Sequence, residues 1–373
     1  MPEFTNESMD IEIANNKLDE YKELCFAAII SGEESKINDA YTSLNNYLIA
    51  NSQLFGYGIN AYGMLACLAM KNGNVDFAFR CLIDADAYSE LANELGHLDW
   101  IACLSAIRMI GGMSARTQNE LLFEKTVEVM SFWCQKQSQS SPTKIAEAIE
   151  AFLFMAADHR YLTALHKLLN LTLILTVYPN EVLLPFLRQW ACICSQSARR
   201  GWVDVSNILL TGLFRFMLKK GDNDSAKNIL FYVNVHLQMY CAWDGLSKAL
   251  IAYAPLIKYS VLTLELAAKH SEAKEYQESV KVVLRFWRDF VAGYSRQQMQ
   301  DEIQVYQALQ DWFMRNENTE QQNIRLKRLL QLTLGYWVAC QPKTALPQLS
   351  LIRDAFVPNY VEGPYLDLFN GIK

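Results

Sequence analysis

Hydrophobic residues recur three and four positions apart along almost the whole chain, and polar residues fill the positions between them. This spacing places the hydrophobic residues on one face of an α-helix. No stretch of five or more residues alternates strictly between hydrophobic and polar while also having the β-branched enrichment that strands show. The pattern therefore predicts an all-α protein.

Short breaks rich in Gly, Asn, Ser and Pro divide this pattern into roughly sixteen helices of about 15 to 20 residues. Two of the breaks have residues typical of helix caps. Ser141-Pro142 predicts an N-cap followed by proline at the first helical position, and Gly221-Asp222 predicts a C-terminal glycine followed by the cap of the next helix. Because the connections are short, we expect consecutive helices to pack as antiparallel hairpins.

The clearest helix pair surrounds the turn Asn72-Gly73-Asn74. Small residues at positions 66 and 78 allow its two helices to approach closely, and larger hydrophobic residues fill the space beside that contact. The repeat positions are Tyr62, Leu65 and Ala66 before the turn, and Ala78, Leu82 and Ala85 after it. This pattern resembles the tetratricopeptide repeat, a family of helix-turn-helix units about 34 residues long that stack into a solenoid.

Similar spacings occur further along the chain. Ala226 and Leu230 follow the Gly221-Asp222 turn, and Ala345 and Leu349 lie near the C-terminus. Two pairings are open in the centre, because the helix of Leu210 can pair either with the preceding helix of Trp190 or with the helix that follows it. These two pairings exclude each other.

The resemblance extends over about residues 57–356 and implies an α-α superhelix, that is, a right-handed solenoid of antiparallel helix hairpins. We expect one continuous solenoid over residues 10–356, with a soft boundary near 135–143. Residues 1–9 are expected to be a flexible N-terminus, and residues 357–373 a C-terminal cap or tail.

Charge, hydrophobic run length and cysteine spacing limit which partners and which cellular location we expect. The formal net charge is −6, from 34 basic and 40 acidic residues, so nucleic acid is not expected to be the main partner. The longest hydrophobic run, residues 168–178, is too short for the ~20 residues that span a bilayer, so we expect no membrane insertion. The nine cysteines form no Cys-x-x-Cys pair and the N-terminus lacks a secretory signal, which together predict a cytoplasmic protein.

Candidate chemical sites are weak in this sequence. Asp84 and Asp86 form an Asp-x-Asp motif, but positions i and i+2 of a helix point about 200° apart, so the two carboxylates cannot bind one ion. We therefore expect Asp84→Asn and Asp86→Asn to have little effect. Cys192 and Cys194 point to different faces for the same reason. The sequence has no phosphate-binding loop, serine-hydrolase elbow or zinc-protease motif. It predicts no catalytic, cofactor or metal site.

The leading functional hypothesis is a non-enzymatic scaffold or adaptor for protein–protein interaction. Similarity to tetratricopeptide proteins implies that a peptide or partner helix binds in a concave groove. With the Trp190 pairing, Arg188, Ser195 and Arg199 face that groove, and with the alternative pairing Arg215 and Lys219 do. Because these residues are mostly basic, we expect an acidic peptide.

Two alternatives remain open at this point. One is an all-helical α/α-toroid enzyme such as a glycan-active hydrolase, which needs paired carboxylates in loops at one end of the barrel. The connections in this sequence are short and have few acidic residues, which argues against that class. The other is a regulatory or sensory segment of a larger protein. The sequence determines neither the partner nor the oligomeric state.

Overall fold

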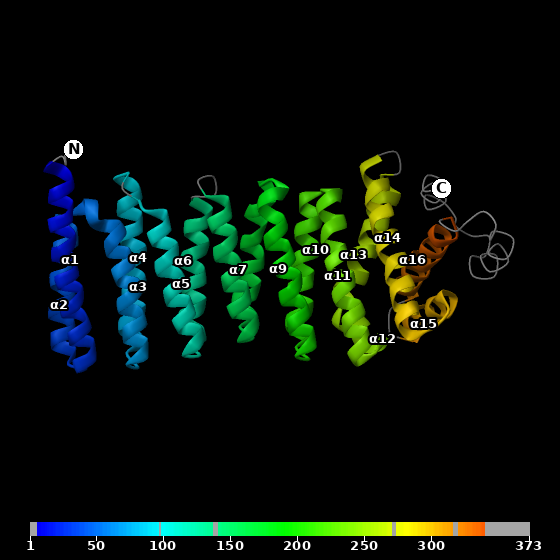
Figure 1. Cartoon of the computed structure of the whole chain (residues 1–373), viewed down its shortest axis with the longest axis horizontal. Helices are drawn as coiled ribbons and strands as arrows, with labels where there is room; N and C mark the ends of the chain where they lie inside the picture. Colours follow the sequence, from blue (N-terminus) through cyan, green and yellow to red (C-terminus); the bar gives the residue numbers. More distant parts are fainter. Residues whose placement is uncertain (1–5, 97, 137–140, 271–273, 316–319, 340–373) are drawn as a thin grey trace. The chain divides into compact units, whose positions relative to one another are not determined.

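The computed structural model describes residues 6–96, 98–136, 141–270, 274–315 and 320–339. Sixteen α-helices and two short 3-10 helices lie within these residues, and none of them forms a β-strand (Figure 1). The prediction of an all-α protein is confirmed. Ala345 and Leu349 lie outside the described residues, as does the proposed C-terminal cap or tail.

The chain divides into two compact units, Met1–Leu175 and Thr176–Lys373. This division lies further along the chain than the soft boundary expected near residues 135–143. The first helix already begins at Asn6, inside the segment expected to be flexible.

The first unit is built from helix pairs arranged in two rows. Each odd-numbered helix packs against the even-numbered helix that follows it. One row contains α1, α3, α5 and α7, and in the other row α4 packs on α6 and α6 on α8. The elements are α1 (Asn6–Ser31), α2 (Glu34–Ala50), η1 (Ser52–Leu54), α3 (Phe55–Lys71), α4 (Val75–Glu94), α5 (Trp100–Arg116), α6 (Glu120–Lys136), α7 (Pro142–Asp158), α8 (Leu162–Leu171) and η2 (Thr172–Val177), the last of which crosses the division between the units.

The second unit repeats this arrangement. Helices α9, α11 and α14 pack side by side, while α10, α12, α13 and α16 form the neighbouring row. Helix α9 pairs with α10, as the Trp190 alternative requires, and α11 packs against α9, α12 and α14. The elements are α9 (Asn180–Arg199), α10 (Val203–Lys220), α11 (Asn223–Asp244), α12 (Leu246–Ala252), α13 (Ala254–Lys269), α14 (Lys274–Gln298), α15 (Glu302–Arg315) and α16 (Glu320–Ala339).

No single helix within the described ranges is long and hydrophobic enough to cross a membrane. Helices α12 and α13 reach that length and composition only when taken together, and they meet at an angle of 68°.

Local signals explain where the helices begin and end. Gly73 adopts a φ of 77°, which glycine reaches without steric cost, and the Asn74 side chain accepts a 3.1 Å hydrogen bond from the backbone N–H of Phe77. Gly221 has a φ of 67°, and Asp222 accepts a hydrogen bond from the backbone N–H of Ser225 at 3.1 Å. All eight described repeat positions are buried: Tyr62, Leu65, Ala66, Ala78, Leu82, Ala85, Ala226 and Leu230.

Contacts between successive helix pairs show the length of the repeating unit. Tyr41 contacts Asp84, 43 residues later, and Cys192 contacts His236, 44 residues later. The spacing therefore exceeds the ~34 residues expected from the tetratricopeptide resemblance and lies in the range of longer helical repeats, about 40 to 47 residues. Helices of 17 to 20 residues in most pairs account for the difference. The protein is an all-helical repeat protein with a long and variable repeat.

Candidate functional site

A stripe of exposed hydrophobic side chains runs along α11. Phe231, Val235, Met239 and Trp243 are 63%, 41%, 41% and 54% exposed, and they follow one another at intervals of four residues. Side chains four positions apart are neighbours on a helix surface, so the stripe is contiguous. Contiguous exposed hydrophobic surface commonly marks a site of protein–protein interaction.

Helix α9 places two arginines beside this stripe. The guanidinium carbon of Arg188 lies 5.0 Å from the ring centre of Tyr232, and that of Arg199 lies 4.0 Å from the ring centre of Trp243. These cation–π contacts hold the arginines against α11. Both arginines are exposed, and neither forms an ion pair with a described residue. We call Arg188, Arg199 and the four stripe residues the α9–α11 surface.

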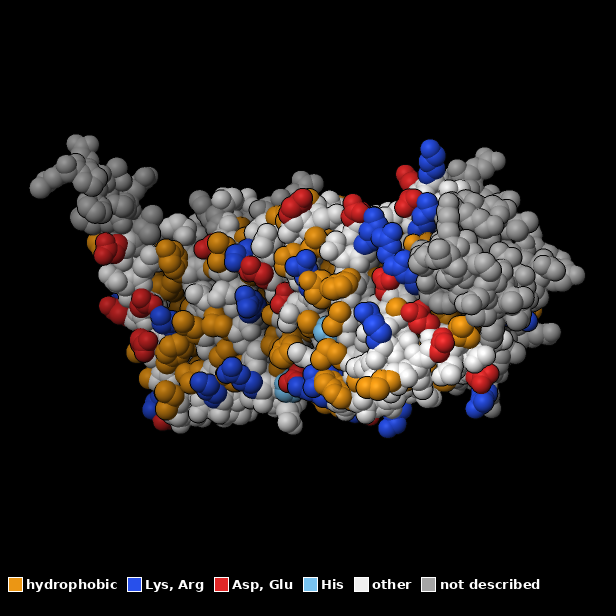
Figure 2. Space-filling model, turned by 45° about the vertical axis from the view of Figure 1, so that its right-hand side comes forward, with side chains coloured by type: hydrophobic (Ala, Val, Ile, Leu, Met, Phe, Trp, Pro, Cys, Tyr) orange, Lys and Arg blue, Asp and Glu red, His pale blue; other side chains and the backbone are white. Residues whose placement is uncertain are grey.

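The charge of this surface is positive along its middle. In the sequence of α9 the only acidic residue is Glu181, at the N-terminal end. In α11 the acidic residues are Asp224 and Asp244, one at each end. Between these ends, neither α9 nor α11 has an acidic residue beside the hydrophobic stripe, and Arg188 and Arg199 border it on the α9 side. On the face that Figure 2 draws, hydrophobic side chains lie among both basic and acidic ones.

A cysteine and a histidine lie between the two arginines. The Cys192 Sγ is 3.6 Å from the His236 Nε2. Burial lowers the pKa of His236, and the charge of Arg199 lowers it further, while burial raises the pKa of the Cys192 thiol. Both groups are therefore held in their neutral forms, which is the opposite of the thiolate–imidazolium pair that a nucleophilic cysteine needs.

An open hollow of about 390 Å³ lies where the stripe ends. Arg199, Arg200 and Lys248 line it together with Tyr240. Asp244 also lines it and lies 3.7 Å from the Lys248 Nζ. Three cations and one carboxylate make this end of the α9–α11 surface suited to acidic groups.

The site residues predicted from the sequence lie in three different places. Arg188 and Arg199 lie on the α9–α11 surface. Arg215 and Lys219 are exposed on α10, which belongs to the other helix row. Ser195 is only 6% exposed and interacts with the side chain of Tyr253, so it is not part of this surface.

Sequence reasoning missed the hydrophobic half of this surface. Phe231, Val235, Met239 and Trp243 were not separated from the core residues of the same helix. The sequence of α11 does contain a signal for them. The other hydrophobic residues of the helix are enough to fill its buried face, which leaves these four for its exposed face. The buried residues of the helix are Ser225, Ala226, Ile229, Leu230, Val233, Asn234, Leu237, Tyr240 and Cys241.

The Asp-x-Asp motif of α4 has a structural role. The Tyr41 hydroxyl donates a 2.7 Å hydrogen bond to Asp84 Oδ2, and the Trp133 Nε1 donates a 2.6 Å hydrogen bond to Asp86 Oδ1. The two carboxylates point in different directions, as the helix geometry requires, and each reaches a neighbouring helix pair. Both aspartates therefore have a structural role, while the expectation that Asp84→Asn and Asp86→Asn have little effect stays a prediction, because an amide oxygen can still accept each hydrogen bond.

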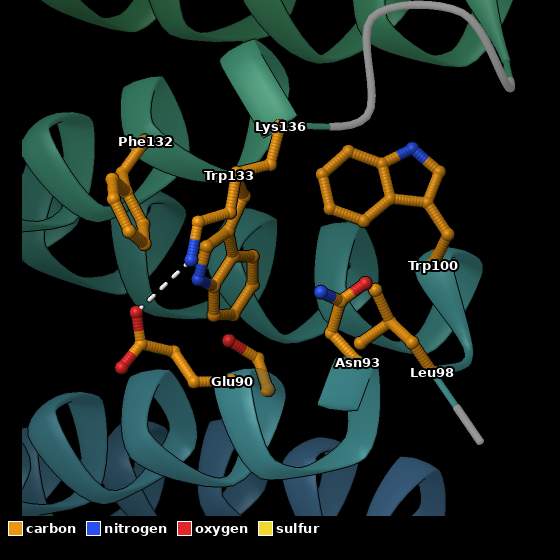
Figure 3. A pocket seen from close by; sticks show the side chains of 8 residues that line it. Glu90, Asn93, Leu98, Trp100, Phe132, Trp133 and Lys136 are labelled. Carbon is orange, nitrogen blue, oxygen red and sulfur yellow. Dashed lines mark hydrogen bonds and ion pairs between the residues drawn. The ribbon is translucent and has the colours of Figure 1, made fainter. Parts of the chain in front are cut away.

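A small hollow beside Trp133 is not a ligand site. Figure 3 shows Trp100, Trp133 and Phe132 around it, with the Lys136 Nζ 3.1 Å from a carboxylate oxygen of Glu90. Its volume of about 10 Å³ has room for roughly one water molecule. We also find no cluster of three or more His, Cys, Asp or Glu side chains that could bind a metal ion in the described part of the chain.

Comparison with known proteins adds a distant likeness only. No family model and no curated protein sequence matches the chain. A solved structure, described as a circular tandem repeat protein with novel repeat topology and enhanced subunit contact surfaces, is 14% identical. The match covers 97% of this chain and 94% of that chain, with a TM-score of 0.34.

Proposed function

We propose that the protein is a non-enzymatic interaction scaffold whose α9–α11 surface binds an acidic amphipathic segment of a partner protein. The main support is the hydrophobic stripe of α11 with arginines stacked along its edge. A partner helix of this kind buries its hydrophobic side against the stripe. Its carboxylates then pair with Arg188 and Arg199.

The dimensions of the stripe set the size of the partner segment. Phe231 and Trp243 are twelve residues apart on one helix, which corresponds to about 18 Å along its axis. A partner helix of about three turns covers that length. The basic hollow at the end of the stripe would receive acidic residues at one end of the segment.

Several finer features remain predictions. These are a right-handed superhelix of the tetratricopeptide type, a concave position of the α9–α11 surface, and location in the cytoplasm. The toroid enzyme and the regulatory segment of a larger protein are the competing hypotheses. A peptide-binding measurement tests the proposed role directly.

Fluorescence anisotropy with labelled amphipathic peptides provides that measurement. The probes are helical peptides of about 14 residues with leucines on one side and either glutamates or lysines on the other. We expect the glutamate probe to bind more tightly than the lysine probe. Arg199→Glu is expected to weaken the glutamate probe about tenfold, because it replaces a cation with a repelling charge.

Lys219→Glu is the matched control, since it makes the same charge change on the exposed side of α10. This variant should bind the glutamate probe like the wild-type protein. If both variants lost the same affinity for the glutamate probe, binding would depend only on the net charge of the protein. The proposed surface would then be wrong.

A further inference from the structure

A second hollow lies in the unit that contains residues 176–373, and it meets the basic hollow of the α9–α11 surface at Ile251. It has a volume of about 490 Å³ and is bordered mainly by α13 and α16, with contributions from α10, α12 and α15. We call it the α13–α16 groove. Sites for small organic ligands usually have volumes of about 300 to 1,000 Å³, so this groove has the size of a small-molecule site.

The walls of the groove are mostly hydrophobic. Ile257, Val261 and Leu262 line it from α13, and Leu326 lines it from α16. Trp312 of α15 adds an aromatic ring, which is held in place by a 3.1 Å hydrogen bond from its Nε1 to Ser247 Oγ. Such walls favour a ligand with a flat or chain-like hydrophobic body.

One polar atom in the groove lacks a partner. The side-chain Oδ1 of Asn207 is buried and accepts no hydrogen bond. A buried acceptor without a donor costs about 1 to 3 kcal/mol, so buried acceptors are normally paired. Because the Asn207 side chain lines the groove, its oxygen can pair with an N–H or O–H group of a ligand once the side chain turns toward the groove.

The charged groups of the groove also differ in their pairing. Arg325 Nε and Glu265 Oε1 are 2.7 Å apart and neutralise each other. Lys258 is exposed and forms no ion pair with any residue that the structure describes. The unpaired charge of the groove is therefore positive, and it complements a ligand with a negative group.

We propose that the α13–α16 groove binds a small amphipathic organic anion. Its hydrophobic body lies against Val261 and Leu326, its hydrogen-bond donor faces Asn207 Oδ1, and its negative group lies near Lys258. Neither α9 nor α11 lines the groove, but Ile251 of α12 borders both the groove and the basic hollow at the end of the α9–α11 surface. Lys258 and Val261 line only the groove, so variants at these two positions test it separately. A hydrophobic segment of another protein is the alternative occupant, and the test separates the two.

The probe 8-anilino-1-naphthalenesulfonate has all three features, namely a hydrophobic ring system, an N–H group and a sulfonate. We expect its fluorescence with the full chain to saturate at one site. Val261→Trp fills the groove and should weaken binding at least about tenfold, and Lys258→Ala should weaken it about fivefold. Lys219→Ala, a lysine removed from α10 outside the groove, should leave the affinity unchanged.

A second probe tests the hydrogen bond. Naphthalene-1-sulfonate keeps the naphthalene ring and the anion but lacks the whole anilino group, that is, both its N–H and its phenyl ring. Asn207→Leu should therefore weaken 8-anilino-1-naphthalenesulfonate and leave naphthalene-1-sulfonate unchanged. The same loss for both probes would overturn the role given to Asn207.

Three results would overturn the site itself. The first is fluorescence that does not saturate, which indicates general hydrophobic adsorption or a surface suited to a protein segment. The second is unchanged affinity in Lys258→Ala, because the proposal places the negative group of the probe beside this lysine. The third is loss of binding in Met239→Glu but not in Val261→Trp, which would place the probe on the α9–α11 surface.

Discussion

The indole nitrogen of Trp133 donates a 2.6 Å hydrogen bond to the carboxylate of Asp86. Trp133 belongs to α6 and Asp86 to α4, so the bond joins two helices of the same row, 47 residues apart in the sequence. Two residues earlier on α4, Asp84 accepts a hydrogen bond from Tyr41 of α2. The helix pair of α3 and α4 is thus connected through side chains to the pair before it and the pair after it.

Removing the indole donor should destabilise the first unit. In Trp133→Phe the partly buried Asp86 carboxylate loses its hydrogen bond while the ring still fills most of the space. We expect the free energy of unfolding to fall by about 1 to 3 kcal/mol. Urea unfolding followed by circular dichroism measures this change.

Asp86→Asn is the control for that variant. Burial raises the pKa of Asp86, so the charged form is costly at this position. The amide oxygen of asparagine can still accept the bond from Trp133 and brings no charge. We therefore expect a smaller loss than in Trp133→Phe, and an equal or larger loss would contradict the role given to this hydrogen bond.

Two adjacent glycines of α5 should respond in opposite directions to alanine. A Cβ at Gly111 would lie 2.4 Å from the Phe152 ring, whereas a Cβ at Gly112 would meet only Met155 Sδ at 3.9 Å. Because Phe152 is fully buried, Gly111→Ala should destabilise the protein by about 1 to 3 kcal/mol. Gly112→Ala should stabilise it by about 0.5 to 1 kcal/mol through helix propensity.

Thermal unfolding of the two single variants tests this pair. Because both substitutions add one methyl group to the same helix turn, their difference reports the packing of α5 against α7. Similar melting temperatures for Gly111→Ala and Gly112→Ala would show that α7 does not pack against α5 as described.

The neutral state of His236 predicts a specific dependence of stability on pH. Burial and the charge of Arg199 hold the pKa of His236 below its usual value of 6.5. At pH values between the folded and the unfolded pKa, the unfolded chain binds more protons than the folded one. Neutral His236 therefore contributes fully to the free energy of unfolding above pH 6.5. This contribution is lost as the pH falls through 6.5 toward the pKa of His236 in the folded protein.

His236→Gln removes this titration and should flatten the acidic side of the profile. The difference in unfolding free energy between wild type and His236→Gln should change as the pH falls from about 7.5 to about 5. Parallel profiles for the two proteins would show that His236 does not sit in the buried, cationic environment beside Arg199.

The local elements of the fold could be predicted from the sequence because their signals are local. The turn at Gly73, the cap at Asp222 and the start of α7 at Pro142 all depend on residues within one helix turn. The partner of α10 could not be predicted in this way. The junctions before and after α10 both have turn chemistry and small residues, so only long-range packing distinguishes them, and the structure pairs α10 with α9.

Only part of the candidate site could be predicted from the sequence, and the reason is a related one. Arg188 and Arg199 follow from the helical periodicity of α9, since polar residues on a hydrophobic helix point outward. Whether Ser195 or Phe231 is exposed depends on which neighbouring helix covers it, and periodicity alone does not contain that information. Burial of Ser195 and exposure of Phe231 therefore became evident only from the packed structure.

Site-specific photocrosslinking tests the central claim most directly. A photoreactive amino acid replaces either Val235 on α11, 41% exposed, or Leu218 on α10, 38% exposed, and the glutamate-bearing amphipathic peptide is added. The account predicts crosslinking from position 235 and none from position 218, with the crosslink lost in Arg199→Glu. Equal crosslinking from both positions, or crosslinking from 218 alone, would contradict it.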